Sequence, residues 1–166
     1  MAFPPAYGLV ALMVLGLDLL TKQLARGLTS PVTLIPGFVG LRYAENTGMA
    51  FSLLSGQTWL LGLASLACIA AGWLILRRYR LGSLSRIAAM LMLGGALGNA
   101  LDRLLRGYVI DMVELLFIDF AIFNLADAAL TVGCLLMGYS LLRHPDEWAL
   151  RAPGTPSNTE ESRHMP

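Results

Sequence analysis

Four long apolar segments alternate with more polar connectors along the chain. The segments cover residues 7–24, 59–76, 87–105 and 123–142. Each is close to the roughly 20 residues that a helix needs to cross the hydrocarbon core of a bilayer. The pattern therefore predicts an all-α membrane protein with four transmembrane helices.

The connector 27–58 carries a different pattern. Short apolar runs lie on either side of Pro36 and Gly37, two residues that favour a turn. Apolar runs bounded by such residues predict short strands, here over 32–43. We therefore expect a small β-rich loop domain outside the membrane, on the extracytoplasmic side.

The composition supports a membrane protein with one compact unit. Of the 166 residues, 56% are hydrophobic and 14% are charged, and the mean hydropathy is +0.64. A soluble domain has about a quarter charged residues. We predict a four-helix membrane domain over 1–143, with extracytoplasmic loops at about 27–58 and 106–122. The Pro, Ser, Thr and Glu content of the remainder predicts a disordered tail over 144–166.

The basic residues predict the orientation of the chain. The connector 77–86 contains four arginines and no acidic residue, which is typical of a cytoplasmic loop. Four spans then place both termini in the cytoplasm and the two other connectors outside. We expect the first span to be retained, because no basic region precedes it and no small-x-small cleavage site follows it.

Two pairs of polar residues lie inside predicted spans, where a charge costs several kcal/mol. Asp18 and Lys22 are four residues apart, so they share a helical face and can pair. A structural ion pair is favoured over a direct role in catalysis. Asn99 and Arg103 are also four apart and can point inward together. Arg103 taken alone could equally extend to the membrane surface.

Two carboxylates are expected near the outer membrane boundary. Asp111 lies in an apolar stretch after the third span, and Asp127 lies about one turn into the fourth. Two neighbouring carboxylates share one proton, because their like charges raise one pKa. Such a pair can activate water for hydrolysis, and Asn124 could orient Asp127. From the spacing alone, two unrelated polar positions are an equal alternative.

The sequence favours no metal, no other cofactor and no nucleic acid as a ligand. Its two cysteines and two histidines lack the spacing of a metal site, and no basic stripe with interleaved aromatic residues is present. Two other functions stay open at this point. One is an ion- or proton-coupled transporter subunit, whose charges would form a relay, and the other is a structural membrane subunit, whose charges would pair with a partner.

Four motifs follow one another along the chain. They are Asp18-Leu19-Leu20-Thr21-Lys22; Asn46-Thr47-Gly48-Met49-Ala50-Phe51-Ser52; Gly94-Gly95-Ala96-Leu97-Gly98-Asn99-Ala100-Leu101-Asp102-Arg103 followed by Gly107-Tyr108-Val109-Ile110-Asp111; and Phe123-Asn124-Leu125-Ala126-Asp127. In this order and on these segments, they resemble the motifs of the lipoprotein signal peptidase family, also called signal peptidase II.

The resemblance implies a membrane aspartyl endopeptidase with Asp111 and Asp127 as its catalytic dyad. It implies that five further residues shape the site or hold the substrate: Asn46, Gly48, Asn99, Arg103 and Asn124. It also implies the substrate, a prolipoprotein that is cut just before a cysteine carrying a diacylglyceryl group, at the outer face of the bacterial cytoplasmic membrane. We expect a monomer surrounded by membrane lipids. The chain departs from the family at Met112 and Ala128, where Phe and Ser are frequent, and these changes could alter the shape of the pocket.

Overall fold

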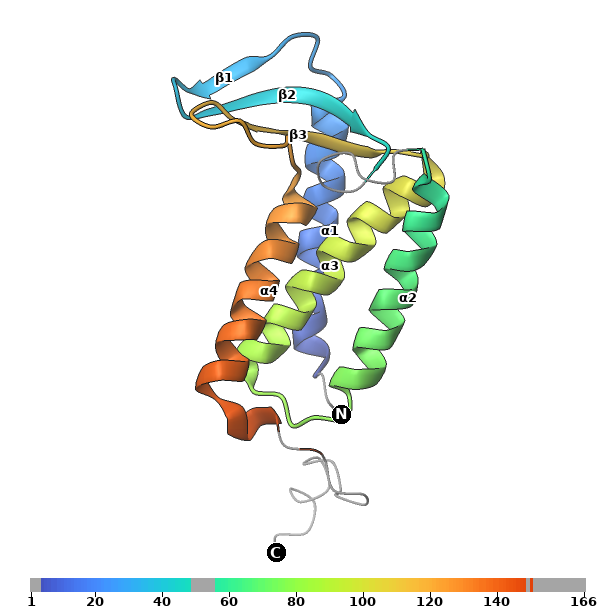
Figure 1. Cartoon of the computed structure of the whole chain (residues 1–166), viewed down its shortest axis with the longest axis vertical. Coiled ribbons are helices and arrows are strands. Elements are labelled where there is room, and N and C mark those ends of the chain that lie inside the picture. Colours follow the sequence, from blue (N-terminus) through green and yellow to red (C-terminus); the bar gives the residue numbers. More distant parts are fainter. Residues whose placement is uncertain (1–3, 49–55, 149, 151–166) are drawn as a thin grey trace, which may run out of the picture.

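The computed structural model describes residues 4–48, 56–148 and 150 as four long helices and a small sheet (Figure 1). The helices are α1 (Pro5–Ala25), α2 (Thr58–Leu76), α3 (Ser83–Leu105) and α4 (Leu125–Arg143). All four are long and apolar enough to cross a membrane. The four predicted spans are therefore confirmed as helices.

All four helices begin within a few residues of the predicted starts, and the starts of α3 and α4 have particular surroundings. α3 begins at Ser83 rather than at residue 87, so that Arg86 lies in its first turn. The Arg86 guanidinium lies 5.6 Å from the centre of the Tyr7 ring, a contact that stabilises the charge there. α4 begins at Leu125 rather than at residue 123, because Asn124 caps it.

A three-stranded antiparallel sheet connects the loops between the helices. Its strands are β1 (Val32–Ile35), β2 (Val39–Asn46) and β3 (Val109–Leu115), in the order β1-β2-β3. The two strands predicted within the first loop are confirmed. The third strand is not predicted by the hydrophobic pattern, and it pairs with β2 across a long separation in sequence, with Asp111 opposite Ala44.

The sheet lies across one end of the helix bundle, where α1 and α3 end and α4 begins (Figure 1). Ile110 and Met112 of β3 pack against Ala25 at the end of α1, and all three are buried. The start of α1 and the end of α4 lie at the opposite end of the bundle (Figure 1). There a short 3-10 helix, η2 (Pro145–Trp148), opens the segment for which disorder is predicted. The rest of that segment, apart from residue 150, lies outside the described residues.

α3 is the central helix of the bundle and packs against α1, α2 and α4. Half of its apolar stretch is buried, compared with 11–22% in the other helices. A methyl group on Gly94 would lie 2.7 Å from the carbonyl oxygen of Ala11, and one on Gly95 would lie 2.5 Å from that of Ala126. These glycines therefore let α1 and α4 approach α3 closely.

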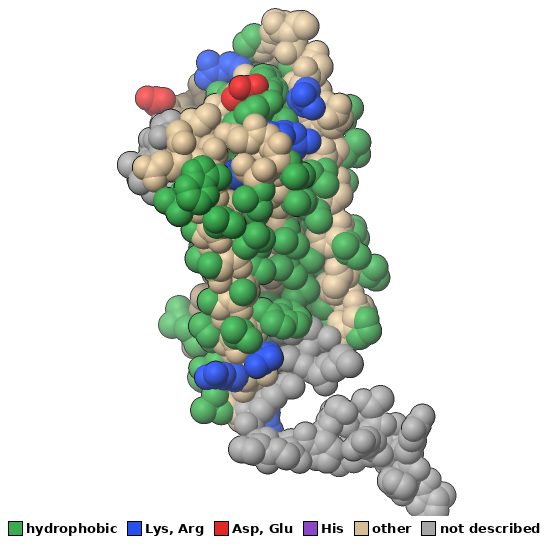
Figure 2. Space-filling view, turned by 90° about the vertical axis from the view of Figure 1, so that its right-hand side faces the viewer, with side chains coloured by type: hydrophobic (Ala, Val, Ile, Leu, Met, Phe, Trp, Pro, Cys, Tyr) green, Lys and Arg blue, Asp and Glu red, His purple; other side chains and the backbone are tan. Residues whose placement is uncertain are grey.

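The outer surface of the bundle is apolar. On the face in Figure 2, hydrophobic side chains cover the middle of the molecule, and charged side chains lie towards its two ends. Leu12 of α1 and Leu135 of α4 are more than 60% exposed. Exposed apolar side chains at this density fit contact with lipid rather than with water.

Candidate active site

Asp111 lies on the face of β3 that lines a cavity at the sheet end of the bundle. Successive side chains of a strand point to opposite faces. Val109, Asp111 and Leu115 accordingly line the cavity, whereas Ile110 and Met112 point towards α1. The strand thus presents one carboxylate between two apolar side chains, and only 3% of Asp111 is exposed.

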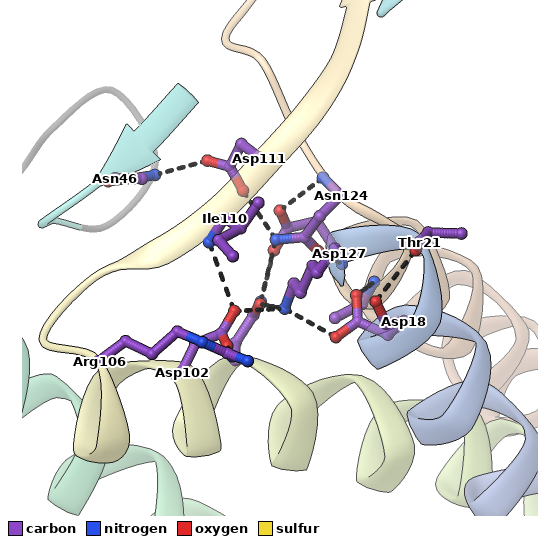
Figure 3. Close-up of polar contacts among 12 residues, drawn as sticks. Asp18, Thr21, Asn46, Asp102, Arg106, Ile110, Asp111, Asn124 and Asp127 are labelled. Atoms are coloured by element: carbon purple, nitrogen blue, oxygen red, sulfur yellow. Dashed lines mark hydrogen bonds and ion pairs between the residues drawn. The ribbon is translucent and has the colours of Figure 1, made fainter. Parts of the chain in front are cut away.

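Two side-chain amides donate hydrogen bonds to the Asp111 carboxylate (Figure 3). Asn46 Nδ2 lies 3.1 Å from Asp111 Oδ2, and Asn124 Nδ2 lies 2.7 Å from Asp111 Oδ1. Asn46 is the last residue of β2, and the β2–β3 register brings it beside Asp111. Both oxygens of this nearly buried carboxylate therefore have a donor.

Asp127 lies in the first turn of α4, where it forms a reciprocal cap with Asn124. Asn124 Oδ1 accepts the Asp127 amide at 2.8 Å, and Asp127 Oδ2 accepts the Asn124 amide at 3.2 Å. This capping box satisfies two amides at the helix start and fixes both side chains. Asn124, which could orient Asp127 by its position in the sequence, thus contacts it through both its side chain and its backbone.

Asn99 of α3 connects the two carboxylates through its amide group. Its Nδ2 donates to Asp127 Oδ1 at 2.7 Å, and its Oδ1 accepts from Asn124 Nδ2 at 3.1 Å. Asn124 donates to Asp111 with the same nitrogen. Side chains from a strand, a helix start and a central helix thereby converge on one place, although they are far apart in sequence.

Arg103 and Gly48 lie at the same cavity, on the side of the second motif. Arg103 donates from its NH2 group to the Gly48 carbonyl oxygen at 3.0 Å, and the Gly48 amide donates to Asn46 Oδ1 at 2.9 Å. Arg103 thus points inward and fixes the chain after β2. The remainder of that motif, Met49-Ala50-Phe51-Ser52, lies outside the described residues.

The cavity has a volume of about 560 Å³. Its polar lining includes five of the predicted site residues: Asn46, Asn99, Arg103, Asp111 and Asp127. Most of its remaining lining is apolar and comes from β3, the segment before α4, and α4 itself. Ala128 also lines the cavity, whereas Met112 faces a separate apolar cavity of about 310 Å³ beside α1. Of the two departures from the family pattern, Ala128 is therefore the one at the site.

Burial raises the pKa of Asp111 from its ordinary value of 3.8 to about 6. The negative charge of Asp127 contributes to this increase, and the hydrogen bonds from Asn46 and Asn124 oppose it. Among the residues that the structure describes, no Lys, Arg or His forms an ion pair with Asp111 or Asp127. Asp111 can therefore keep its proton up to about pH 6, well above the range in which an ordinary aspartate ionises.

A second polar cluster lies just inside the bundle. Lys22 Nζ is 2.7 Å from Asp18 Oδ2 and 2.9 Å from Asp102 Oδ2, and all three side chains are fully buried. Arg106 forms an ion pair with the other oxygen of Asp102. The spacing of Asp18 and Lys22 predicts their pairing, and the two side chains do pair. The ion pair between Asp102 and Arg106 is not predicted, although these residues are also four apart, a spacing that favours pairing on a helix.

The chemistry available at the cavity is that of carboxylates, amides and a guanidinium group. Within residues 4–48, 56–148 and 150, no three Asp, Glu, His or Cys side chains could hold a metal ion. Two neighbouring carboxylates, of which Asp111 has a raised pKa, can act as general base and general acid on a water molecule and a carbonyl group. The site is therefore suited to hydrolysis.

Solved structures share the fold of this chain. Two solved structures of bacterial membrane enzymes superpose with TM-scores of 0.80 and 0.77, at 27% and 29% identity. The matches cover 93% and 86% of this chain and 96% of each of the solved chains. The fold described above is thus the fold of known membrane enzymes.

Two relatives are lipoprotein signal peptidases. The protein from Latilactobacillus sakei subsp. sakei is 44% identical over 111 residues, which cover 66% of this chain and 74% of the relative. The protein from Streptococcus pyogenes serotype M3 is 40% identical over 139 residues, which cover 83% and 90%. The family model described as signal peptidase (SPase) II matches residues 10–143, which include both carboxylates of the cavity. The chain therefore belongs to the signal peptidase II family, whose members are peptidases of the bacterial membrane.

Proposed function

We propose that Asp111 and Asp127 are the catalytic pair with which this peptidase removes signal peptides from prolipoproteins. The observation that carries the proposal is the position of Asn124. It donates to Asp111 and forms a capping box with Asp127 at the wall of one cavity. Two carboxylates held by one residue can act on the same peptide bond.

In the proposed reaction, Asp127 is ionised and Asp111 carries the shared proton. Asp127 takes a proton from a water molecule while the water oxygen bonds to the scissile carbonyl carbon. Asp111 gives its proton to the carbonyl oxygen, which produces a tetrahedral diol. The diol returns one hydroxyl proton to Asp111, the carbon–nitrogen bond breaks, and Asp127 gives its proton to the leaving amine. Both carboxylates then have their starting charges. The raised pKa of Asp111 supports this assignment.

The amides and the guanidinium group have supporting roles in this proposal. Asn99 and Asn124 orient the carboxylates through the hydrogen bonds described above. Asn46, Gly48 and Arg103 hold the chain at the edge of the cavity, where an extended peptide can bind beside the strands.

The substrate in this proposal is a prolipoprotein that carries a diacylglyceryl group on the cysteine after the cleaved bond. A lipid-anchored cysteine is confined to the membrane boundary, so a site at the end of the helices meets the bond beside it. Apolar side chains from β3 and α4 line the cavity next to the carboxylates and fit the acyl chains. The depth of the lipid-anchored cysteine in the membrane would then determine which peptide bond is cleaved.

The proposed orientation places the sheet and the cavity at the outer face of the cytoplasmic membrane. Arginines occupy the connector between α2 and α3, at the opposite end of the bundle from the sheet. A connector rich in arginine favours the cytoplasm. Both termini would then be cytoplasmic, and water would reach the cavity from outside.

A cleavage assay with purified protein in detergent tests the catalytic pair. The substrate is a prolipoprotein that carries the diacylglyceryl group. We expect wild-type protein to release the signal peptide, and Asp111→Asn and Asp127→Asn each to lose cleavage by at least about 1,000-fold, because Asn cannot transfer the proton. Asp119→Asn is the matched control: it removes an exposed carboxylate from the same loop and should cleave normally.

The assay also separates the alternatives left open by the sequence. A transporter or a structural subunit would not cut the substrate. Cleavage at the wild-type rate by either Asp111→Asn or Asp127→Asn, in protein that unfolds at the wild-type temperature, would remove that residue from the proposed pair. Loss of cleavage in the Asp119→Asn control would show that the loop, rather than the pair, had been disturbed.

A further inference from the structure

We infer that Lys22 is a positioning residue for the catalytic pair and acts through Asn99, in addition to pairing with Asp18. The inference rests on the proposed roles of Asp111 and Asp127. Its starting point is a third contact of the Lys22 ammonium group. Besides the two carboxylates, Nζ lies 3.0 Å from Asn99 Oδ1. Asn99 in turn donates to Asp127.

The contact with Asn99 is not needed to neutralise the charge of Lys22. Asp18 and Asp102 lie within 3 Å of the ammonium and already supply two negative charges. An ammonium group has three N–H donors and no acceptor. Two of its donors are accounted for by the carboxylates, and the third is directed at the neutral amide of Asn99.

The third donor determines which way the Asn99 amide faces. An amide can be turned over so that its oxygen and nitrogen exchange places. In the turned state, the Asn99 nitrogen would face the Lys22 ammonium, and its oxygen would face the Asp127 carboxylate. Both contacts would be repulsive. Lys22 therefore holds the Asn99 oxygen inward and the Asn99 nitrogen towards Asp127.

Lys22 is suited to this task because its donor character cannot be reversed by rotation. Asn99 and Asn124 each carry a donor and an acceptor, so each depends on its neighbour for its orientation. Lys22 can only donate. Among these three connected side chains, it is the fixed reference that sets the direction of the hydrogen bonds towards the carboxylates.

The surrounding helices hold the ammonium group in place. Lys22 and Asp18 come from α1, whereas Asp102 and Asn99 come from α3, so the cluster joins the two helices. A methyl group on Gly98 would overlap the Asp18 carboxylate, so glycine is needed for this approach. Asp18 also accepts the Ala126 amide of α4 at 2.9 Å. A buried group with these contacts has little freedom to move.

Loss of Lys22 should therefore slow the chemical step more than it weakens substrate binding. The Asn99 amide would be free to turn, and Asp127 would lose an oriented donor. Lys22 does not line the cavity, whereas Asn99 does. We expect kcat to fall by about 10- to 100-fold with KM within about threefold. The pH profile of kcat should also shift to higher pH, because positive charge near the pair is removed.

A double-mutant cycle between Lys22→Met and Asn99→Ala tests the inference. If Lys22 acts through Asn99, the double variant should have a kcat within about threefold of the slower single variant, because the second change removes a contact that is already lost. If the two reductions in kcat multiply, or if Lys22→Met cleaves at the wild-type rate, the inference is wrong. The readout is cleavage of the lipidated prolipoprotein by the full chain in detergent.

A second variant covers the case in which Lys22→Met does not fold, since it leaves the buried Asp18 without a cation and Asp102 with Arg106 alone. Asp18→Asn/Lys22→Met removes one charge of each sign, and the oxygen of the introduced side-chain amide can still accept the Ala126 amide. Asp18→Asn alone is the matched control, because it keeps the Lys22 contact with Asn99. We expect the control within about threefold of the wild-type kcat and the double variant at least about tenfold lower. Equal kcat values for the two would overturn the inference.

The same assay distinguishes this inference from the proposed function. If Asp127→Asn is inactive and Lys22→Met keeps the wild-type kcat and pH profile, the catalytic pair stands and the positioning role of Lys22 is wrong. If Asp127→Asn is active, the proposed pair itself is wrong, and the positioning role is overturned with it.

Discussion

The molecule contains two neighbouring pairs of aspartates, and the carboxylates of the two pairs have different partners. Asp18 and Asp102, inside the bundle, are ion-paired with Lys22, and Asp102 also pairs with Arg106. Asp111 and Asp127, at the cavity, receive hydrogen bonds from neutral amides instead. The residue type is the same in both pairs, and the groups that contact the carboxylates differ.

The partner determines what each carboxylate can do. A cation at ion-pair distance favours the charged form, so the inner pair is suited to joining the helices through Lys22. An amide donor stabilises a carboxylate less than a cation does, and burial then raises the pKa, as it does for Asp111. The inner pair thus holds the structure, and the outer pair is suited to exchanging protons. Asn99 contacts both groups and links them.

The largest effect expected from breaking this arrangement is on stability. Asp102→Leu leaves the buried Lys22 with one carboxylate and leaves Arg106 without its ion pair. Removing one partner of a buried ion pair costs about 3–5 kcal/mol. We expect a clear fall in the unfolding temperature of the purified protein, measured by thermal unfolding in detergent.

The matched control for this prediction is Arg42→Ala, which breaks a partly exposed ion pair with Glu114 on the sheet. Exposed ion pairs contribute about 0–1 kcal/mol. If Asp102→Leu and Arg42→Ala lower the unfolding temperature equally, the inner cluster does not hold the helices together as described.

The inner and outer clusters also differ in how far the sequence predicts them. Contacts between near neighbours follow from spacing, as for Asp18 with Lys22 and for Asn124 with Asp127. The contact between Lys22 and Asn99 joins residues 77 positions apart, and no pattern along the chain encodes it. It depends on how closely α1 and α3 pack.

The position of Asp111 shows the same limit for the sheet. The four helices are predicted because each is long and apolar, and the strands of the first loop because a turn separates their apolar runs. β3 is a single short apolar run without a neighbouring partner in sequence, and such a run is ambiguous between strand and helix. Its pairing with β2 supplies the alternation that places Asp111 in the cavity. The family motifs pointed to this residue, whereas its secondary structure could not be derived from the hydrophobic pattern.

A smaller expected effect is a dependence of stability on pH. It should distinguish the outer pair of aspartates, which includes Asp111, from the inner pair. The folded protein binds a proton at Asp111 more tightly than the unfolded chain does, since the pKa is about 6 rather than 3.8. The stability that this group contributes is therefore present below about pH 4 and is lost as the pH rises to about 6. The loss amounts to about 3 kcal/mol, at 1.36 kcal/mol for each pKa unit.

Thermal unfolding of wild-type protein and Asp111→Asn between pH 4 and pH 7 measures this contribution. We expect the wild-type unfolding temperature to fall relative to that of Asp111→Asn as the pH rises through this range. Asp119→Asn, which lacks an exposed carboxylate of the same loop, should follow the wild type. Parallel curves for wild type and Asp111→Asn would mean that Asp111 is not a buried group with a raised pKa.

The smallest expected effect tests whether amide donors set the acidity of the outer pair. Asn46→Ala removes one donor to Asp111, and that hydrogen bond lowers the Asp111 pKa. Without it the pKa should rise, so Asp111 would keep its proton, which the proposed reaction requires, to higher pH. We expect the alkaline limb of the cleavage profile to move up by about half a pH unit, which is about 0.7 kcal/mol and within the range of one hydrogen bond to a charged group. Arg42→Ala, a change on the same strand that removes a charge but no donor to Asp111, should leave that limb in place. A limb that stays fixed in Asn46→Ala, or that moves to lower pH, would show that the neutral amides orient the carboxylates without tuning their acidity.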